Sequence, residues 1–450
     1  MKRNKASYVS GAAALLLSSV TVKILGALFK IPLTNLIGDS GMGLFAFAMQ
    51  FFSLLFVISA AGLPAAQAHL VSEALALGRR EQAKAITVRA VSVFAVTSLL
   101  LSLALAGAAP MLCQLFGQTA AVPCLLLIAP AVFLVTVEAA LRGWYQGTGD
   151  MVPTAISQVA EAVGKLVVGL FAASTLLHAG YGIAGAAAGA VFGVTCGELF
   201  AVLYLLWSVR RGAWQALRHP PKEQHEFSKL VQLMIPVTLG AAVMTVSGFL
   251  DMSVVYRRLP VAGFSSQEVV AAYGAYTGMA LTLFNLPQSL SNAVSVSVLP
   301  ALSAAHAKKQ DRQVRRLLRS SMGLTLLVCI PCGIGLFVLA GPLLQLLFAS
   351  QPHGVQTATP LLRLLGVAEP LVGLSTVTIS ILQAFGRPDL SVYAMTVACT
   401  VKFAVGFYLA GQPNINILAL PIGTLTCYSI LLVMNLTFIA HVLHPRRYNY

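Results

Sequence analysis

The sequence predicts an all-α protein that crosses a membrane about twelve times, in two lobes of six helices each. Of its 450 residues, 58% are hydrophobic and only 10% are charged, against about 25% charged residues in an ordinary soluble domain. Two further observations support this fold class: long stretches without charge, and basic residues concentrated on one side of the predicted membrane. So few charges cannot cover a water-facing surface, so the composition excludes soluble and disordered proteins.

Several stretches of more than 30 residues contain no Asp, Glu, Lys or Arg. Four of them lie between Arg89 and Glu138, Lys165 and Glu198, Arg319 and Arg363, and Lys402 and Arg446. A membrane span needs about 20 apolar residues, so the longest of these stretches can hold two spans and a tight turn. The strands of a membrane β-barrel are shorter and alternate in polarity, so that class is excluded as well.

The predicted spans follow one another with short connections. They cover 9–30, 43–68, 88–109, 121–141, 153–176, 182–207, 229–255, 271–297, 320–341, 361–384, 389–411 and 415–441. The basic start of the chain before an apolar run is typical of a signal peptide. However, the run is too long and lacks a clear cleavage site, so we expect a retained first span.

The basic residues are distributed unequally between the two sides of this topology. Of 29 Lys and Arg residues, 22 fall on one side, four on the other, and three inside spans. The positive-inside rule therefore predicts that both termini are cytoplasmic. The net charge of +15 is then explained by topology rather than by nucleic-acid binding. The basic segment 306–319 is expected to lie on the anionic inner leaflet.

The longest polar stretch divides the chain at its middle. We predict an N-terminal lobe over 1–207, a cytoplasmic linker over 208–228 and a C-terminal lobe over 229–450. Because each lobe has an even number of spans, the two would be parallel repeats.

Short sequence matches support this repeat. Four residues recur 237 positions later; the pairs are Gln146 with Gln383, Gly149 with Gly386, Lys165 with Lys402, and Gly169 with Gly406. A weaker match, 228 positions apart, places Lys30 opposite Arg258 and Lys23 opposite Asp251.

Three lysines inside predicted spans are the strongest candidates for function. Lys165 and Lys402 lie near the middle of their spans, and Lys23 lies in the first span. An ionised side chain at the centre of a bilayer costs roughly 2.5–3.5 kcal/mol on insertion scales, so such residues usually face a cavity or a partner. The alternatives are snorkelling to the interface and pairing, for which Glu161 stands four residues before Lys165.

Other polar residues in the spans complete the predicted site. We expect Gln146 and Gln383 to line a central cavity together with the three lysines. The embedded acids that could couple to an ion or pair with a cation are Asp251, Glu161, Glu198 and Glu369, whereas Glu138 and Arg142 have the spacing of a local ion pair. Residues expected at an outer gate are Lys30, Asp39 and Arg258, with Asp39 in a glycine-rich turn.

The sequence lacks the usual signatures of enzymes and cofactor sites. It contains no P-loop and no histidine spacing typical of a metal site, and no cytoplasmic loop is long enough for a catalytic domain. The seven cysteines mostly lie in apolar runs and are expected to be inert, including the Cys329–Cys332 spacing. We therefore predict no cofactor, no metal and no enzymatic activity.

Three segments resemble a known family. They are the run from Lys23 to Gly43, the block Arg142-Gly-Trp-Tyr-Gln-Gly147, and Met151 to Gln158 followed by Glu161. They resemble polysaccharide-biosynthesis flippases of the stage V sporulation protein B type, which share a superfamily with lipid II flippases and multidrug antiporters. The resemblance implies a V-shaped exporter with a central cavity in the bacterial plasma membrane. In lipid II flippases a basic residue of the first span helps to line this cavity, and Lys23 is the matching position. Typical members have fourteen spans, whereas twelve are predicted here, so the route of a lipid tail is left open.

The resemblance and the embedded lysines together predict a flippase. The expected cargo is an undecaprenyl-pyrophosphate-linked oligosaccharide or peptidoglycan precursor, exported by alternating access. A pyrophosphate needs fixed positive charge along its path, which Lys23, Lys165 and Lys402 could supply. With no nucleotide site, an ion gradient (Na⁺ or H⁺) or the membrane potential would drive export. We expect a monomer whose partners are the lipid-linked sugar and membrane lipids.

Three alternatives are open from the sequence. A cation-coupled multidrug antiporter of the same fold would have a cavity dominated by acids. A membrane glycosyltransferase or acyltransferase would need a carboxylate or histidine set at a membrane face. A non-transporting scaffold would tolerate neutral replacement of Lys165 and Lys402 together.

Overall fold

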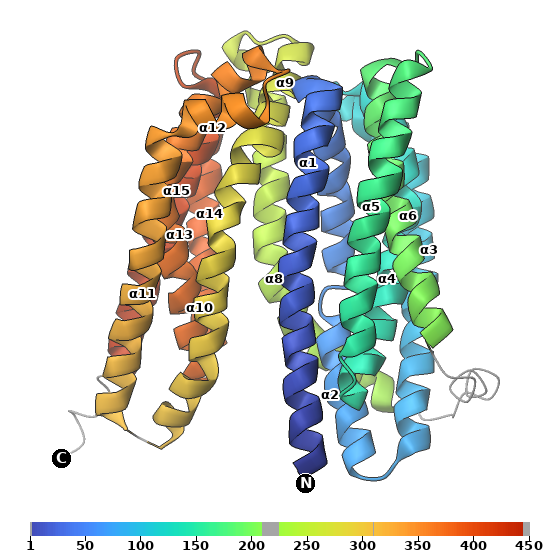
Figure 1. The fold of residues 1–450 in the computed structure, drawn as a ribbon, viewed down its shortest axis with the longest axis vertical. Helices are drawn as coiled ribbons and strands as arrows, with labels where there is room; N and C mark the ends of the chain where they lie inside the picture. The colour runs from blue at the N-terminus through green and yellow to red at the C-terminus, as the bar shows by residue number, and fades with distance from the viewer. Residues whose placement is uncertain (1, 209–224, 309, 444–450) are drawn as a thin grey trace. The chain divides into compact units, whose positions relative to one another are not determined.

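The computed structural model describes residues 2–208, 225–308 and 310–443, and within these ranges every regular element is a helix (Figure 1). The chain divides into two compact units, unit 1 (Met1–Phe249) and unit 2 (Leu250–Tyr450). Most of the linker predicted over 208–228 lies outside the described residues. The division between the units falls inside helix α8 (His225–Arg258), so the first part of the seventh predicted span packs with the six before it.

Unit 1 consists of long helices joined by short turns. They are α1 (Lys2–Ser59), α2 (Leu63–Ala76), α3 (Arg80–Leu115), α4 (Val122–Thr148), α5 (Val152–His178), α6 (Gly182–Ser208) and the first part of α8. A short 3₁₀ turn (Thr119–Ala121) leads into α4. Prolines stand in the first turn of α2, α4 and α5, where the missing N–H costs no helical hydrogen bond.

The first two predicted spans are joined without a loop. The apolar helical stretch Leu17–Ala76 has 60 residues, which as a straight helix would measure about 90 Å, three times the hydrocarbon thickness. Gly38 breaks it with φ 71° and ψ −176°, a conformation that only glycine adopts without strain. The loop expected around Asp39 is therefore reduced to this break, and Asp39 Oδ1 accepts a hydrogen bond from the Ser40 N–H at 2.7 Å.

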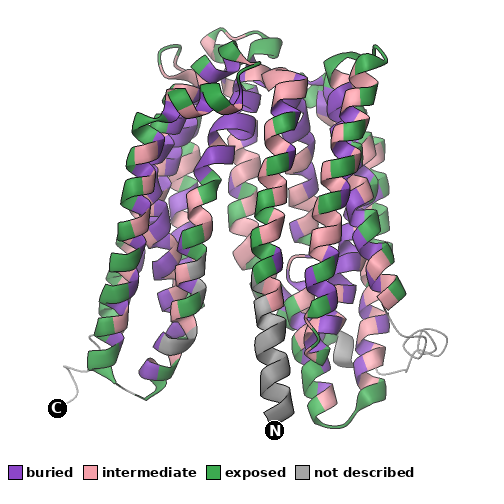
Figure 2. Cartoon of the chain, viewed as in Figure 1, coloured by how far each residue is buried: buried purple, intermediate pink, exposed green. Residues whose placement is uncertain are grey.

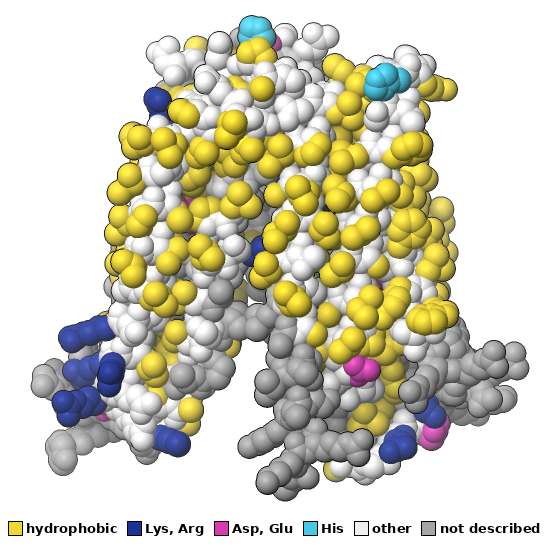
Figure 3. Space-filling view, in the orientation of Figure 1, with side chains coloured by type: hydrophobic (Ala, Val, Ile, Leu, Met, Phe, Trp, Pro, Cys, Tyr) yellow, Lys and Arg dark blue, Asp and Glu magenta, His cyan; other side chains and the backbone are white. Residues whose placement is uncertain are grey.

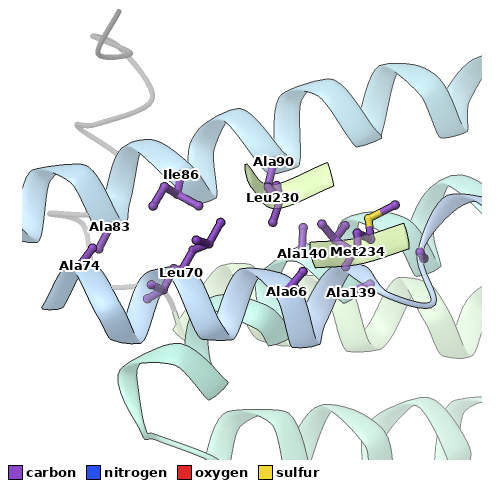
Figure 4. Packing of buried hydrophobic residues seen from close by; sticks show 13 residues of the cluster. Ala66, Leu70, Ala74, Ala83, Ile86, Ala90, Ala139, Ala140, Leu230 and Met234 are labelled. Carbon is purple, nitrogen blue, oxygen red and sulfur yellow. The ribbon is translucent and has the colours of Figure 1, made fainter. Parts of the chain in front are cut away.

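Small side chains let four helices of unit 1 approach closely. Figure 4 shows alanines and a few larger apolar residues of α2, α3, α4 and α8 packed into one cluster. The labelled residues are Ala66, Leu70, Ala74, Ala83, Ile86, Ala90, Ala139, Ala140, Leu230 and Met234. Its members are at least nine-tenths buried, and this packing fixes the lower part of α4, which carries charged residues of the candidate site.

Helices α5 and α6 touch at the backbone. Gly189, Gly193 and Gly197 recur every fourth residue along one face of α6. A Cβ at Gly193 would lie 2.2 Å from Gly169 Cα, and one at Gly197 would lie 2.5 Å from the Glu161 carbonyl oxygen. This small-residue spacing is a common device for close helix packing in membranes. It holds Glu161 and Lys165 of α5 next to Glu198 of α6.

Unit 2 repeats the helical design with more irregularity. After α8 come α9 (Ser266–Gly274), a π-helical segment η4 (Ala275–Ala280), α10 (Leu281–Ala307), α11 (Asp311–Val338), α12 (Ala340–Leu347), α13 (Pro352–Ala384), α14 (Pro388–Ala410) and α15 (Ala419–Leu443). A buried cluster of α10, α11, α13 and α15 forms its core, with Leu302, Leu318, Ile381, Leu382 and Ile439 among its members.

The outer faces of both units are apolar. In each unit, buried residues lie where helices face one another and exposed residues line the outside (Figure 2). Large hydrophobic side chains are exposed on α3 and α11, for example Leu100 at 62% and Leu327 at 71%. Figure 3 shows hydrophobic side chains spread over the middle of the visible faces. Lys and Arg side chains gather at one end of unit 2, where Arg312, Arg315 and Arg319 of α11 are exposed.

In the described residues, eleven helical stretches are long and apolar enough to cross a membrane. The first of them contains the two spans that meet at Gly38, so the twelve predicted spans each have a counterpart. The protein is a multi-pass α-helical membrane protein, as the sequence predicted.

Candidate functional site

Arg142 of α4 links α4 to α5 through a polar network. Its guanidinium forms an ion pair with Glu138, one turn earlier on α4. Its Nη2 also donates to Glu161 Oε2 of α5 at 3.1 Å, and its Nε donates to Ser157 Oγ of α5 at 3.0 Å. The local pair expected between Glu138 and Arg142 is therefore present, and Glu161 is bound by Arg142.

Glu198 of α6 completes this network, which we call the carboxylate cluster (Glu138, Glu161, Glu198 and Arg142). Glu138, Glu161 and Glu198 each place a carboxylate oxygen within 4.8 Å of the others. Glu138 is fully buried and Glu198 is 4% exposed, and Glu198 Oε2 has no hydrogen-bond partner. Within the described residues this is the one group of three or more acids, histidines or cysteines close enough to share a metal ion. The cluster lies about ten residues, or roughly 15 Å, from the adjacent ends of α4, α5 and α6.

Lys165 of α5 lies one turn beyond the carboxylate cluster. Its ammonium lies 5.2 Å from the centroid of the Phe29 ring of α1, within the range of a cation–π interaction. It also interacts electrostatically with Glu161 and Glu198, and with Lys30 of α1. Lys165 and Lys30 are both half-buried, and the ammonium of Lys165 lies against α1, the helix that carries Lys30.

The other cavity residues predicted in unit 1 lie apart from this pair. Lys23 is exposed on α1, two turns before Lys30. Gln146 is half-buried but stands only two residues before the end of α4. Both positions stay predictions as cavity residues.

In unit 2, Lys402 of α14 is paired with Asp251 of α8. The Lys402 ammonium donates to Asp251 Oδ2 at 2.6 Å, and the two side chains are 13% and 16% exposed. Gly423 of α15 makes room for the lysine, because a Cβ there would lie 3.2 Å from Lys402 Cγ. Tyr276, in the π-helical segment η4, interacts electrostatically with both members of the pair.

The remaining predicted residues of unit 2 are separate. Arg258 at the end of α8 donates from Nε to the Phe407 carbonyl oxygen at 3.0 Å and stacks on the Phe407 ring, 4.5 Å from its centroid. Gln383 is exposed in the last turn of α13. Glu369 of α13 is fully buried, and neither of its carboxylate oxygens has a hydrogen-bond partner.

The comparisons with known proteins identify the family. The sequence model of the family described as "Polysaccharide biosynthesis protein" matches residues 8–306. The chain belongs to this polysaccharide biosynthesis protein family. A second model, MatE, matches residues 232–408 of this family member.

Two proteins of Bacillus subtilis (strain 168) resemble this polysaccharide biosynthesis protein over most of its length. Stage V sporulation protein B is 28% identical, over 98% of this chain and 85% of the relative. Lipid II flippase MurJ is 24% identical, over 88% of this chain and 76% of the relative.

Solved structures of multidrug transporters have the same fold. An inward-facing multidrug resistance MATE family transporter of the MOP superfamily aligns with a TM-score of 0.78 at 15% identity, over 94% of this chain and 96% of that one. A MOP superfamily transporter from Pyrococcus furiosus aligns with a TM-score of 0.64 at 14% identity, over 98% of this chain and 96% of that one. The binding pocket of that transporter is described as having reversed polarity.

Sequence reasoning missed two partners in this polysaccharide biosynthesis protein. It left Lys402 without a local partner, because Asp251 lies 151 positions away. It also assigned Arg142 only to Glu138, although Arg142, Ser157 and Glu161 stand in the block that resembled the family. None of the seven cysteines, which all lie within the described residues, forms a disulfide, and Cys329 contacts Ser291 Oγ at 3.0 Å.

Proposed function

We propose that the protein moves a polyprenyl-pyrophosphate-linked saccharide from the cytoplasmic to the outer face of the bacterial plasma membrane. The observation that carries this proposal is the similarity to stage V sporulation protein B and lipid II flippase MurJ along most of the chain. We further propose that the protein has twelve spans with both termini in the cytoplasm, and that its two lobes work by alternating access. The cargo is a peptidoglycan or surface-polysaccharide precursor, and the protein works as a monomer.

Cations of unit 1 would receive the pyrophosphate. Lys165 lies against α1 and interacts electrostatically with Lys30, and Lys23 precedes Lys30 on the same helix. Like charges held at close range attract a polyanion, and lysine suits this task as a mobile point charge. We propose that Lys23 and Lys165 bind the pyrophosphate and that Gln146 also contacts the cargo.

Lys402 has a different part in this proposal. Because its ammonium is bonded to Asp251, its charge is neutralised in the structure described here. Lys402 would reach the pyrophosphate, with Gln383, only after leaving Asp251. A substrate phosphate would then replace the carboxylate as its partner.

Lys30, Asp39 and Arg258 are proposed as outer-gate residues.

A multidrug antiporter coupled to Na⁺ or H⁺ is the second candidate. The MatE match over 232–408 and the fold of the solved multidrug transporters favour it. Its cavity would use acids, and Asp251, Glu161, Glu198 and Glu369 are the available ones. Three of these four acids are engaged by, or close to, a cation of the same unit, which favours the anionic cargo.

Reconstitution in vesicles tests the proposal. A fluorescent undecaprenyl-pyrophosphate disaccharide is placed in both leaflets, and a membrane-impermeant quencher reports how fast the inner-leaflet lipid becomes accessible. We expect the wild-type protein to accelerate this step, Lys165→Ala to slow it at least tenfold, and Lys165→Arg to restore most of it. Lys308→Ala, which removes an exposed cation at the end of α10, is the matched control and should act like wild type.

Two results would contradict the proposal. If wild-type vesicles move no lipid-linked sugar but release a cationic dye, the antiporter is correct. If Lys165→Ala moves the lipid as fast as Lys308→Ala, the function stands but the assigned binding residue is wrong.

A further inference from the structure

The carboxylate cluster of unit 1 carries more negative than positive charge. Glu138, Glu161 and Glu198 meet around a single guanidinium, that of Arg142. Lys165 is a further cation that interacts with two of these acids, Glu161 and Glu198. With all three carboxylates ionised and both cations present, the cluster would keep one uncompensated negative charge inside the membrane.

Burial makes that charge costly. Glu138 is fully buried, Glu198 is 4% exposed, and Glu198 Oε2 finds no hydrogen-bond donor. Two carboxylates held this close cannot both stay ionised in a medium of low polarity, and they typically share one proton. A buried acid without a donor is also the group that gains most from carrying a proton itself, because a carboxyl group can donate a hydrogen bond to a neighbouring oxygen.

A metal ion fits the cluster less well than a proton. Hard cations in proteins take about six oxygen ligands. Arg142 already contacts one carboxylate oxygen of Glu138 and one of Glu161. Its Nε donates a hydrogen bond to Ser157 Oγ, so that hydroxyl oxygen is also engaged. Too few free oxygens are left for a complete shell.

We propose that Glu138 and Glu198 hold one exchangeable proton between them, while Arg142 and Lys165 neutralise the remaining charges of the carboxylate cluster. The charged groups that face the proton are Arg142 on α4, Glu161 and Lys165 on α5, and, through Lys165, Lys30 on α1. The proton passes to water when the cluster becomes hydrated and returns by the same route. Its role in transport rests on the proposed function: the rate of lipid translocation depends on pH through this one site.

Infrared spectroscopy of the purified full-length protein tests for the proton directly. A protonated carboxyl group has a carbonyl-stretch band that the carboxylate and the glutamine amide lack. We expect Glu198→Gln to remove one such band from the wild-type spectrum and Glu81→Gln, at an exposed acid of α3, to remove none. Glu369→Gln removes a second, separate band, because Glu369 is buried without a partner in unit 2.

The spectrum also supplies the outcomes that would overturn the proposal. If both Glu198→Gln and the second variant Glu138→Gln keep every wild-type band, no proton is held there. If the wild-type band is absent and NaCl, but not KCl, raises the apparent Tm of wild type and not of Glu198→Gln, the cluster binds a metal ion instead. Size-exclusion profiles confirm that each variant is folded before its spectrum is compared.

The translocation assay separates this inference from the proposed function. For a single titrating proton, the wild-type rate should change by up to tenfold per pH unit on one side of the titration, and Glu198→Gln should flatten this dependence. If wild type moves the lipid but Glu198→Gln keeps the same pH dependence, the inference fails and the function stands. If no lipid is moved but the infrared band behaves as expected, the function fails and the proton site stands.

Discussion

The contact between α5 and α6 leads to a quantitative prediction. Replacing Gly193 by alanine would place a Cβ 2.2 Å from Gly169 Cα and 2.4 Å from Gly169 N. Ordinary van der Waals contact begins at 3.4 Å, so α6 must move by about 1.2 Å. Neither neighbouring atom belongs to a flexible side chain that could turn away, so the cost falls on the packing of the two helices.

Overpacking of this kind costs about 1–3 kcal/mol. For a unit of this size, such a cost should lower the apparent Tm by roughly 2–12 °C. The measurement is the fraction of protein that stays monodisperse in detergent after heating. The matched control is Gly107→Ala in α3, where no atom lies within 4 Å of the new Cβ, and this variant should be as stable as wild type.

The same displacement should also be visible in the carboxylate cluster. Moving α6 away from α5 separates Glu198 from Glu161, so the infrared band assigned to the shared proton should shift in Gly193→Ala and not in Gly107→Ala. Equal thermal stability of the two alanine variants would show that the helices are not packed as described, and the reasoning would then be wrong.

Three further predictions concern stability. Asp251→Asn or Lys402→Met alone should each destabilise unit 2 by about 3–5 kcal/mol, whereas the double variant should lose far less stability. Thermal unfolding of the two single variants and the double variant, compared with wild type, completes a double-mutant cycle. Additive effects of the two substitutions would argue against the ion pair. Arg142→Lys should be less stable than wild type and should lose the link to either Glu138 or Glu161, because an ammonium cannot reproduce a planar guanidinium fork; a wild-type Tm would contradict this geometry. A reducing agent should leave the Tm unchanged because none of the seven cysteines, all within the described residues, forms a disulfide, and a drop on reduction would reveal one.

Most of the fold could be predicted from the sequence. Membrane spans depend on local hydrophobicity and length, so each of the twelve predicted ranges overlaps a helical stretch. The break at Gly38 escaped prediction as a helix joint, because a glycine-rich segment such as 38–43 is equally typical of a loop.

The candidate site could be predicted only in part. The embedded lysines and acids stand out by their cost in a bilayer, but their partners come from other helices, and helix packing is not a local property. Lys165 and Lys402 occupy matching places in the repeat, yet Lys165 lies beside Phe29 while Lys402 is bonded to Asp251. A repeat in sequence therefore predicted equivalent positions but not equivalent surroundings.

The same difference applies to the glycines that follow these lysines. A Cβ at Gly169 would lie 2.8 Å from the Phe29 ring, whereas one at Gly406 would meet nothing within 4 Å. The two halves keep the residue, but only the first half uses it for close packing.

The π-helical segment η4 gives the unit 2 ion pair an adjustable neighbour. A π turn holds one residue more than an α turn, and one residue corresponds to about 100° of rotation around a helix axis. If the π turn shifted by one turn along the helix, Tyr276 would rotate away from Asp251 and Lys402. The length of the helix across the bilayer would stay the same. Such a shift would change the surroundings of Lys402 without unfolding the helix.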